Sequence, residues 1–188
     1  MNREFSFLER VINSSNTGDL EYTLRSAQLE PADLQGKRIL NIGAGKVDLQ
    51  KELDQRGIEA QVVNVDRAYN PLKRARKFFY WRVDRKEIPR PAIRGDFKKL
   101  PFRDGSFDIA FASQSVGSFP FKRNVKLRGI SEMIRVSQDS YIFPMEEPDY
   151  KSLFQKGKNE LPKHRVKHLS STDAVHIQPP LTYRRRLR

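Results

Sequence analysis

The sequence predicts an α/β fold, a Rossmann-like and mostly parallel sheet with helices on both faces. Three observations predict it. Residues 38–47 (RILNIGAGKV) read as an apolar strand, a glycine turn and the first turn of a helix. A second apolar run at 60–65 ends in Asp66, and a third at 107–112 follows a turn. A strand, a glycine turn and a helix form the opening unit of open sheets that bind nucleotides.

The chain is expected to form one domain with a central part at 36–145. Residues 1–35 are expected to hold two helices, one over 4–12 and one from about 20 to 29 capped by Asp19, and 146–188 form a basic C-terminal part. The helix after the glycine turn is expected to end at Gly57, a common C-terminal residue for helices. Further predicted elements are strands over 92–94, 107–112 and 141–143, helices over 127–136 and 150–155, and a hairpin within 165–187.

The glycine turn and Asp66 point to a ligand that contains ribose. Glycines let the backbone bend sharply and let a ligand approach, although a tight turn needs no ligand. Asp66 ends the second strand a little over twenty residues later, where a carboxylate accepts hydrogen bonds from ribose hydroxyls. Asp48 breaks the dinucleotide pattern, and Val47 after Lys46 breaks the P-loop pattern. A ligand with ribose but no phosphate, such as S-adenosylmethionine, fits better.

A second stretch gives the sequence a specific family resemblance. Residues 95–113 read GDFKKLPFRDGSFDIAFAS. Together with the glycine turn and Asp66, this stretch resembles the class I S-adenosylmethionine-dependent methyltransferases, in particular the type 11-like group. The resemblance covers roughly residues 36–145. It implies the class I methyltransferase fold, with a degenerate first motif and a C-terminal part that is shortened and possibly truncated at its last strands.

The resemblance also implies roles for individual residues. Asp96 would accept a hydrogen bond from the adenine amino group, Phe97 would offer its backbone N–H, and Ser113 would lie near the transferable methyl group. Asp108 is a hallmark of the family that usually serves the fold. No catalytic residue is assigned. The predicted cofactor-binding residues are Asn41, Gly43, Ala44, Gly45, Asp66, Arg67, Asp96, Phe97 and Ser113.

Departures from the family pattern leave alternatives open. Asn41 stands where the family usually has Asp or Glu, and Val47 stands where it has a third glycine, so that its branched side chain would crowd the methionine moiety. An inactive methyltransferase-like binding or regulatory module is therefore one alternative, and a small-molecule methyltransferase is another. A nicotinamide dehydrogenase is disfavoured by Asp48.

The charge distribution suggests a polyanionic partner. The formal net charge is +13. Residues 71–103 carry twelve Lys/Arg against three Asp/Glu, and residues 151–188 carry ten against two. Such blocks are the electrostatic footprint of a nucleic acid, so RNA is the favoured acceptor, while a solvated basic surface is the alternative. Aromatic residues at 78–81 lie among these cations and would either stack on bases or pack on the sheet.

Composition excludes several other functions. The sequence has no cysteine, which excludes disulfides, Cys-ligated metals and pyrimidine C5 methylation through a cysteine nucleophile. The three histidines have no acidic partner at zinc-site spacing, so no metal is expected. No apolar run reaches about eighteen residues, and the N-terminal residues have no apolar core for a secretion signal. We therefore expect no membrane segment and a cytoplasmic location.

Overall fold

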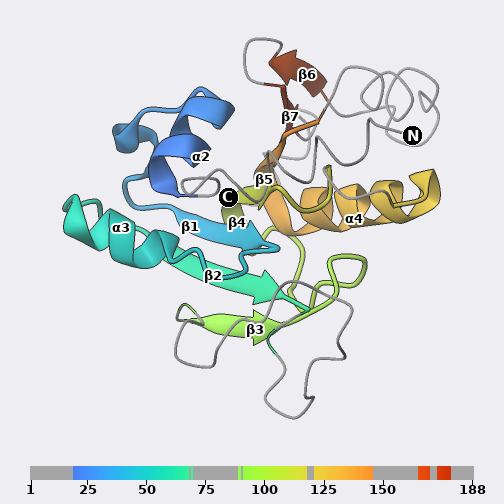
Figure 1. The fold of residues 1–188 in the computed structure, drawn as a ribbon, viewed down its shortest axis with the longest axis horizontal. Helices are drawn as coiled ribbons and strands as arrows, with labels where there is room; N and C mark the ends of the chain where they lie inside the picture. The colour runs from blue at the N-terminus through green and yellow to red at the C-terminus, as the bar shows by residue number, and fades with distance from the viewer. Residues whose placement is uncertain are drawn as a thin grey trace, which may run out of the picture.

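The predicted strands lie side by side in one seven-stranded sheet in the order β3-β2-β1-β4-β5-β7-β6 (Figure 1). This is a computed structural model, and it describes residues 19–67, 69, 89, 91–117, 121–145, 165–169 and 173–178. The strands are β1 (Arg38–Ile42), β2 (Gln61–Asp66), β3 (Ala92–Arg94), β4 (Phe107–Ser113), β5 (Ser137–Phe143), β6 (Arg165–Leu169) and β7 (Ala174–Gln178). The helices are α2 (Leu20–Ala27), the 3-10 helix η1 (Pro31–Leu34), α3 (Leu49–Gln55) and α4 (Arg123–Val136).

The first five strands are parallel to one another, and β7 is antiparallel to both β5 and β6. The hairpin predicted within 165–187 is therefore confirmed. Both C-terminal strands are present, so the possible truncation does not extend to the sheet. The predicted helices at 4–12 and 150–155 lie outside the described residues, as do most of the aromatic segment and most of the C-terminal basic block.

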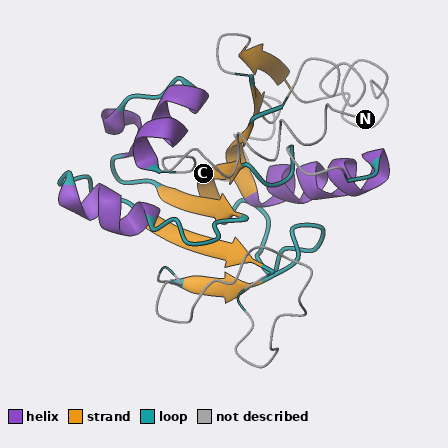
Figure 2. Ribbon diagram, viewed as in Figure 1, coloured by secondary structure: helices purple, strands orange, loops and turns teal. Residues whose placement is uncertain are grey.

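Helices cover both faces of the sheet (Figure 2), because residues of each inner strand alternate between two hydrophobic clusters. One cluster joins the strands to α4 through residues such as Ile130 and Met133. The other joins them to α2 and α3 through residues such as Leu24 and Leu53. Asp19 caps α2 by accepting a hydrogen bond from the Tyr22 N–H over 2.7 Å, as predicted.

The starts of two elements differ from the sequence prediction by about one helical turn or more, and the other boundaries differ by at most two residues. The fifth strand starts at Ser137 rather than Tyr141, and α4 starts at Arg123 rather than at residue 127. The polar residues at the start of β5 are satisfied within the fold: Ser137 Oγ donates to the Met133 carbonyl over 2.8 Å. A polar stretch can therefore form an inner strand, which its composition did not indicate.

Backbone bonds align the C-terminal ends of β1 to β5 along one side of the sheet, called here the carboxyl edge. Gly43 N–H donates to the Val65 carbonyl over 2.8 Å, and Gly95 N–H donates to the Asp66 carbonyl over 3.2 Å. At the other end of the strands, the Asp108 carboxylate accepts from the Arg38 N–H over 2.8 Å. Asp108 thus serves the fold, as the resemblance implied.

Candidate cofactor site

The two glycines of the turn are needed for different structural reasons. Both have positive φ, 70° at Gly43 and 55° at Gly45. A Cβ at Gly43 would collide with the Cβ of Ser115, which follows β4, whereas a Cβ at Gly45 would meet nothing within 4 Å. Gly43 therefore lets the loops after β1 and β4 approach each other. Gly45 provides the left-handed backbone at a position that faces open space, where a ligand has room.

Asp66 is held directly against this turn. Its Oδ2 accepts a hydrogen bond from the Gly45 N–H over 3.0 Å, and its side chain is half-buried. Tyr69 fixes the next peptide group of the turn, since its hydroxyl donates to the Gly45 carbonyl over 2.8 Å. Burial raises the pKa of Tyr69, and the charges of Asp66 and Asp48 raise it further. The phenol therefore stays protonated and remains a donor.

Tyr69 is a site residue that the sequence did not reveal. It lies outside any strand or helix, so no periodicity marks it, and its bond to Gly45 spans 24 residues. Its ring is buried, with 4% of its surface exposed.

Asp96 follows β3, the strand next to the one that ends in Asp66. The Gly95 N–H bonds the Asp66 carbonyl, which places Asp96 immediately after that contact. Its carboxylate accepts from the Lys98 N–H over 3.0 Å and pairs with Lys98 Nζ at 3.3 Å. Partial burial raises the pKa of Asp96, but the bonds and charge of Lys98 and the charge of Arg67 outweigh it and hold the pKa below its ordinary value. Asp96 is thus an ionised acceptor with Arg67 nearby.

Phe97 contributes packing through its ring. The ring is 9% exposed, contacts Gly129 of α4, and lies 5.3 Å from the ring of Phe121, centroid to centroid. A Cβ at residue 129 would collide with it, so the glycine permits this close approach. With its side chain held in the core, Phe97 can offer a ligand only its backbone.

The side chain of Asn41 forms its hydrogen bond with the neighbouring strand β2 and not with the glycine turn. Asn41 is 3% exposed, and its Nδ2 donates to Asn64 Oδ1 over 3.1 Å. Asn64 Nδ2 in turn donates to the Pro91 carbonyl over 3.2 Å. The structure therefore brings Gly43, Ala44, Gly45, Asp66, Arg67 and Asp96 together, while the Asn41 amide is used between strands.

Two other residues of the first motif serve the fold. Val47 is partly buried and packs against the hydrophobic cluster under α2 and α3. Asp48 caps α3 by accepting from the Lys51 N–H over 3.2 Å.

β4 ends in an unsatisfied hydroxyl, that of Ser113, and a loop follows it. Ser113 Oγ is buried and has no hydrogen-bond partner within the described part of the chain. Ser115 Oγ instead donates to the Ile42 carbonyl over 2.9 Å and ties this loop to the glycine turn. A buried hydroxyl without a partner is costly unless something bonds it, so Ser113 is a candidate ligand contact.

These features fit an adenosine-containing group. Two carboxylates on neighbouring strand ends match ribose hydroxyls and an adenine amino group, and Gly45 leaves space beside them. The part of the chain that the structure describes has no cluster of three His, Asp or Glu suited to a metal ion. Its helices include none long and apolar enough to cross a membrane.

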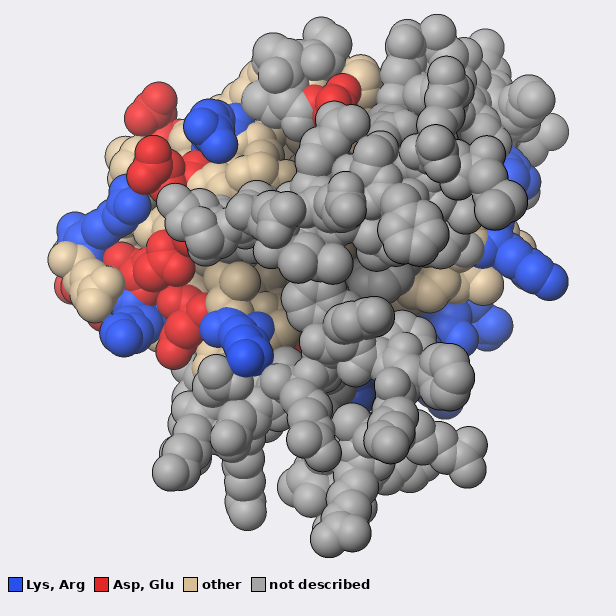
Figure 3. Space-filling view, viewed as in Figure 1, with Lys and Arg blue, Asp and Glu red and all other residues tan. Residues whose placement is uncertain are grey.

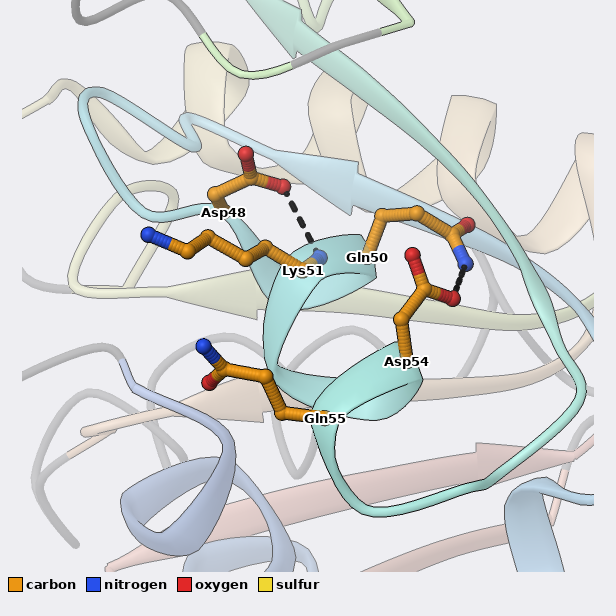
Figure 4. A pocket seen from close by; sticks show the side chains of 5 residues that line it. All are labelled: Asp48, Gln50, Lys51, Asp54 and Gln55. Atoms are coloured by element: carbon orange, nitrogen blue, oxygen red, sulfur yellow. Dashed lines mark hydrogen bonds between the residues drawn. The ribbon is translucent and has the colours of Figure 1, made fainter.

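A separate hollow of about 400 Å³ lies along α3 (Figure 4). It is lined by Asp48, Gln50, Lys51, Asp54 and Gln55. Gln50 Nε2 donates to Asp54 Oδ1 over 2.8 Å, and no predicted cofactor residue lines the hollow. It is a surface feature of the helix and not the cofactor site.

Comparisons with known proteins agree with this geometry. A family model described as a methyltransferase domain matches residues 40–140. The malonyl-(acyl-carrier protein) O-methyltransferase of Legionella pneumophila is 36% identical over 89 residues, which are 47% of this chain and 30% of that protein. The enzyme of the same name from Xylella fastidiosa is 33% identical over 98 residues, 50% of this chain and 32% of that protein. The chain thus spans about a third of the length of these relatives.

A solved structure shows the same fold at low identity. The 1,6-didemethyltoxoflavin-N1-methyltransferase of Burkholderia thailandensis, solved with S-adenosylhomocysteine, is 12% identical with a TM-score of 0.51. The match covers 94% of this chain and 85% of that one. The family model covers more than half of the chain. The chain therefore belongs to the class I S-adenosylmethionine-dependent methyltransferase family, whose cofactor is S-adenosylmethionine.

Proposed function

We propose that this chain transfers the methyl group of S-adenosylmethionine to an acceptor at the carboxyl edge. The observation that carries the proposal is the placement of Asp66 and Asp96 on adjacent strand ends beside the glycine turn. The cofactor, when bound, supplies an electrophilic methyl group on a sulfonium. Family membership supports this chemistry, and the contacts of these residues suit the cofactor's sugar and base.

Each residue has a distinct binding role in this proposal. Asp66 accepts hydrogen bonds from the ribose hydroxyls, Asp96 accepts from the adenine amino group, and Phe97 offers its backbone N–H. Ser113 provides a hydroxyl beside the methionine end. Acceleration then comes mainly from holding donor and acceptor in line, which needs no general base.

Calorimetry with the cofactor tests the proposal. Wild-type protein should bind S-adenosylmethionine, and Asp66→Ala should weaken the affinity while Glu21→Ala, an exposed acid on α2, should not. An absence of binding at millimolar cofactor would end the proposal.

RNA is the acceptor that the charge favours. The net charge of +13 suits a partner with a phosphate backbone better than a neutral small molecule. Incubation with labelled cofactor and total RNA should place label in the RNA fraction. Label confined to protein or small molecules would contradict this acceptor.

A carboxyl group on a carrier protein is the second candidate acceptor. The two relatives from Legionella and Xylella carry names for such an O-methylation. Transfer to malonyl-acyl carrier protein, seen as a base-labile methyl ester, would favour this candidate over RNA.

A module that binds without turnover is the remaining alternative. Asn41 stands where the family usually has an acid, and its side chain bonds Asn64 on the neighbouring strand. This departure favours a module without turnover. Methyl transfer from labelled cofactor into any cellular fraction would eliminate it.

A further inference from the structure

The described residues divide into an acidic end and a basic end. Residues 19–66 carry six Lys/Arg against nine Asp/Glu, whereas residues 94–135 carry nine against four. In Figure 3 the acidic side chains gather on the left, over α2 and α3, where some Lys and Arg lie among them, whereas Lys and Arg alone are seen on the right, beside α4. A molecule with such a charge separation presents its basic end to a polyanion.

An aromatic contact brings two dibasic pairs together at the carboxyl edge. The rings of Phe97 and Phe121 lie 5.3 Å apart, and Phe97 also contacts Gly129. Lys98 and Lys99 directly follow the first ring, Lys122 and Arg123 directly follow the second, and Arg128 directly precedes the glycine. These cations, called here the basic edge, are Lys98, Lys99, Lys122, Arg123 and Arg128.

The acids of this region form ion pairs with Lys98 or with Arg135, which is not part of the basic edge. Asp96 pairs with Lys98 at 3.3 Å, and both Asp104 and Glu132 pair with Arg135 at 2.8 Å. Among the described residues, none of these acids pairs with Lys99, Lys122 or Arg128, which are all exposed. The charges of Lys99, Lys122 and Arg128 are therefore not compensated by these acids.

The cations at the start of α4 do not stabilise this helix. Lys122 is the N-cap of α4, it provides no side-chain cap, and the first turn of the helix holds no acid. Cations at the positive end of a helix dipole destabilise the helix. An anionic partner at the basic edge removes this repulsion.

We infer that the basic edge binds the phosphate backbone of RNA and presents the strand to the cofactor site beside Asp96. The inference rests on the proposed function, because it supplies the docking surface for that acceptor. An acidic protein fits less well. Protein interfaces have an apolar core, but the apolar residues described here are either buried, as Phe97 and Leu127 are, or packed against the core cluster, as Phe121 and Val125 are. Binding to phosphates needs no such core.

A pair of matched quadruple variants tests the surface. One variant carries K99Q, K122Q, R123Q and R128Q, and it leaves Lys98 in place because that residue pairs with Asp96. The control carries R25Q, K37Q, K51Q and R56Q, which removes the same number of exposed cations from the α2 and α3 end. Both variants are checked for cooperative urea unfolding before use. Binding of a single-stranded RNA of about twenty nucleotides is followed by fluorescence anisotropy across a salt series.

The plot of log affinity against log salt should be less steep for the basic-edge variant than for the wild type, by about three in slope. Each phosphate contact on a single strand contributes about 0.7 to this slope, and the variant removes four cations. The control should keep the wild-type slope. Equal loss in both variants, an unchanged slope in the basic-edge variant, or no RNA binding by the wild type would overturn the inference. Displacement of RNA by poly-glutamate at equal charge concentration would also overturn it, in favour of an acidic protein.

Calorimetry with S-adenosylmethionine on the same variants separates the two proposals. Cofactor binding that survives in both variants, together with lost RNA binding in one, supports the docking surface. If the wild type binds RNA through the basic edge but never binds the cofactor, the methyl-transfer proposal fails and the assignment of the surface to RNA still stands.

Discussion

Asn41 of β1 and Asn64 of β2 are paired side chain to side chain, with Asn41 Nδ2 donating to Asn64 Oδ1 over 3.1 Å. The two residues are direct partners in the strand register and are 3% and 0% exposed. Asn64 cannot reverse its amide without losing its own bond to the Pro91 carbonyl. A carboxylate at residue 41, the group usual in the family, would face a carbonyl oxygen in the core.

The variant Asn41→Asp should therefore destabilise the fold by about 3 kcal/mol at neutral pH, because it leaves a buried charge facing an acceptor. Urea unfolding measures the loss. The effect should shrink in acid, where the new carboxyl group is protonated. Asn124→Asp, which adds the same charge at an exposed position in the first turn of α4, is the control and should not destabilise the fold. An N41D protein as stable as wild type would refute this account of the pair.

The two turn glycines should respond differently to alanine. Gly43→Ala combines a φ of 70° with a collision against Ser115, so it should cost about 3 kcal/mol of unfolding free energy. Gly45→Ala meets nothing and should cost only about 1–2 kcal/mol through its backbone. Its methyl group enters the open space, so cofactor affinity should fall at least about tenfold. The double variant G43A/S115G should recover part of the stability. Identical behaviour of the two glycines would contradict the assigned geometry.

Tyr69→Phe removes the hydroxyl that holds the Gly45 carbonyl. We expect a stability loss of about 1 kcal/mol and a cofactor affinity about fivefold weaker, because the turn loses one of its two fixed bonds. Tyr22→Phe is the control, since the Tyr22 ring packs edge-on against Phe143 at 5.8 Å. Unfolding curves and calorimetry measure both quantities. A loss in Y22F as large as in Y69F would argue against a specific role of Tyr69.

Glu132 should make the fold sensitive to acid. Its hydrogen bonds with Arg135 hold the pKa of Glu132 below the ordinary value of 4.5, despite partial burial. A lowered folded-state pKa gives stability that is complete above the unfolded pKa and is lost as pH falls through the folded value. Below about pH 4.5, wild-type protein should thus lose stability more steeply than Glu132→Gln. Thermal unfolding at several pH values measures the slopes, with Glu21→Gln as the exposed control. Parallel slopes for E132Q and wild type would exclude this coupling.

The strands were largely predictable, because their signal is local. The third strand was predicted at its observed bounds, and the other parallel strands up to β4 within one residue, since apolar runs between turns fix them. The start of β5 was missed because Ser137 and its polar neighbours are satisfied by partners that only the fold supplies.

The site was only partly predictable, because its contacts are long-range. Motif spacing was enough to identify the glycine turn, Asp66 and Asp96, which the fold brings to one edge. Tyr69 and the pairing of Asn41 with Asn64 depend on residues more than twenty positions apart, which no local pattern encodes. Roles toward the cofactor remain predictions for all nine residues.

The two outer strands of the sheet also bear on self-association. Within the described residues, β3 is three residues long and ends in Arg94, and β6 carries Lys167 at its centre; both side chains are exposed. Short edge strands with cations discourage the pairing of one copy's backbone with that of another. Raising the ionic strength shortens the range of that repulsion to below about 10 Å. Concentrated salt is therefore the condition under which aggregation through strand addition should first emerge.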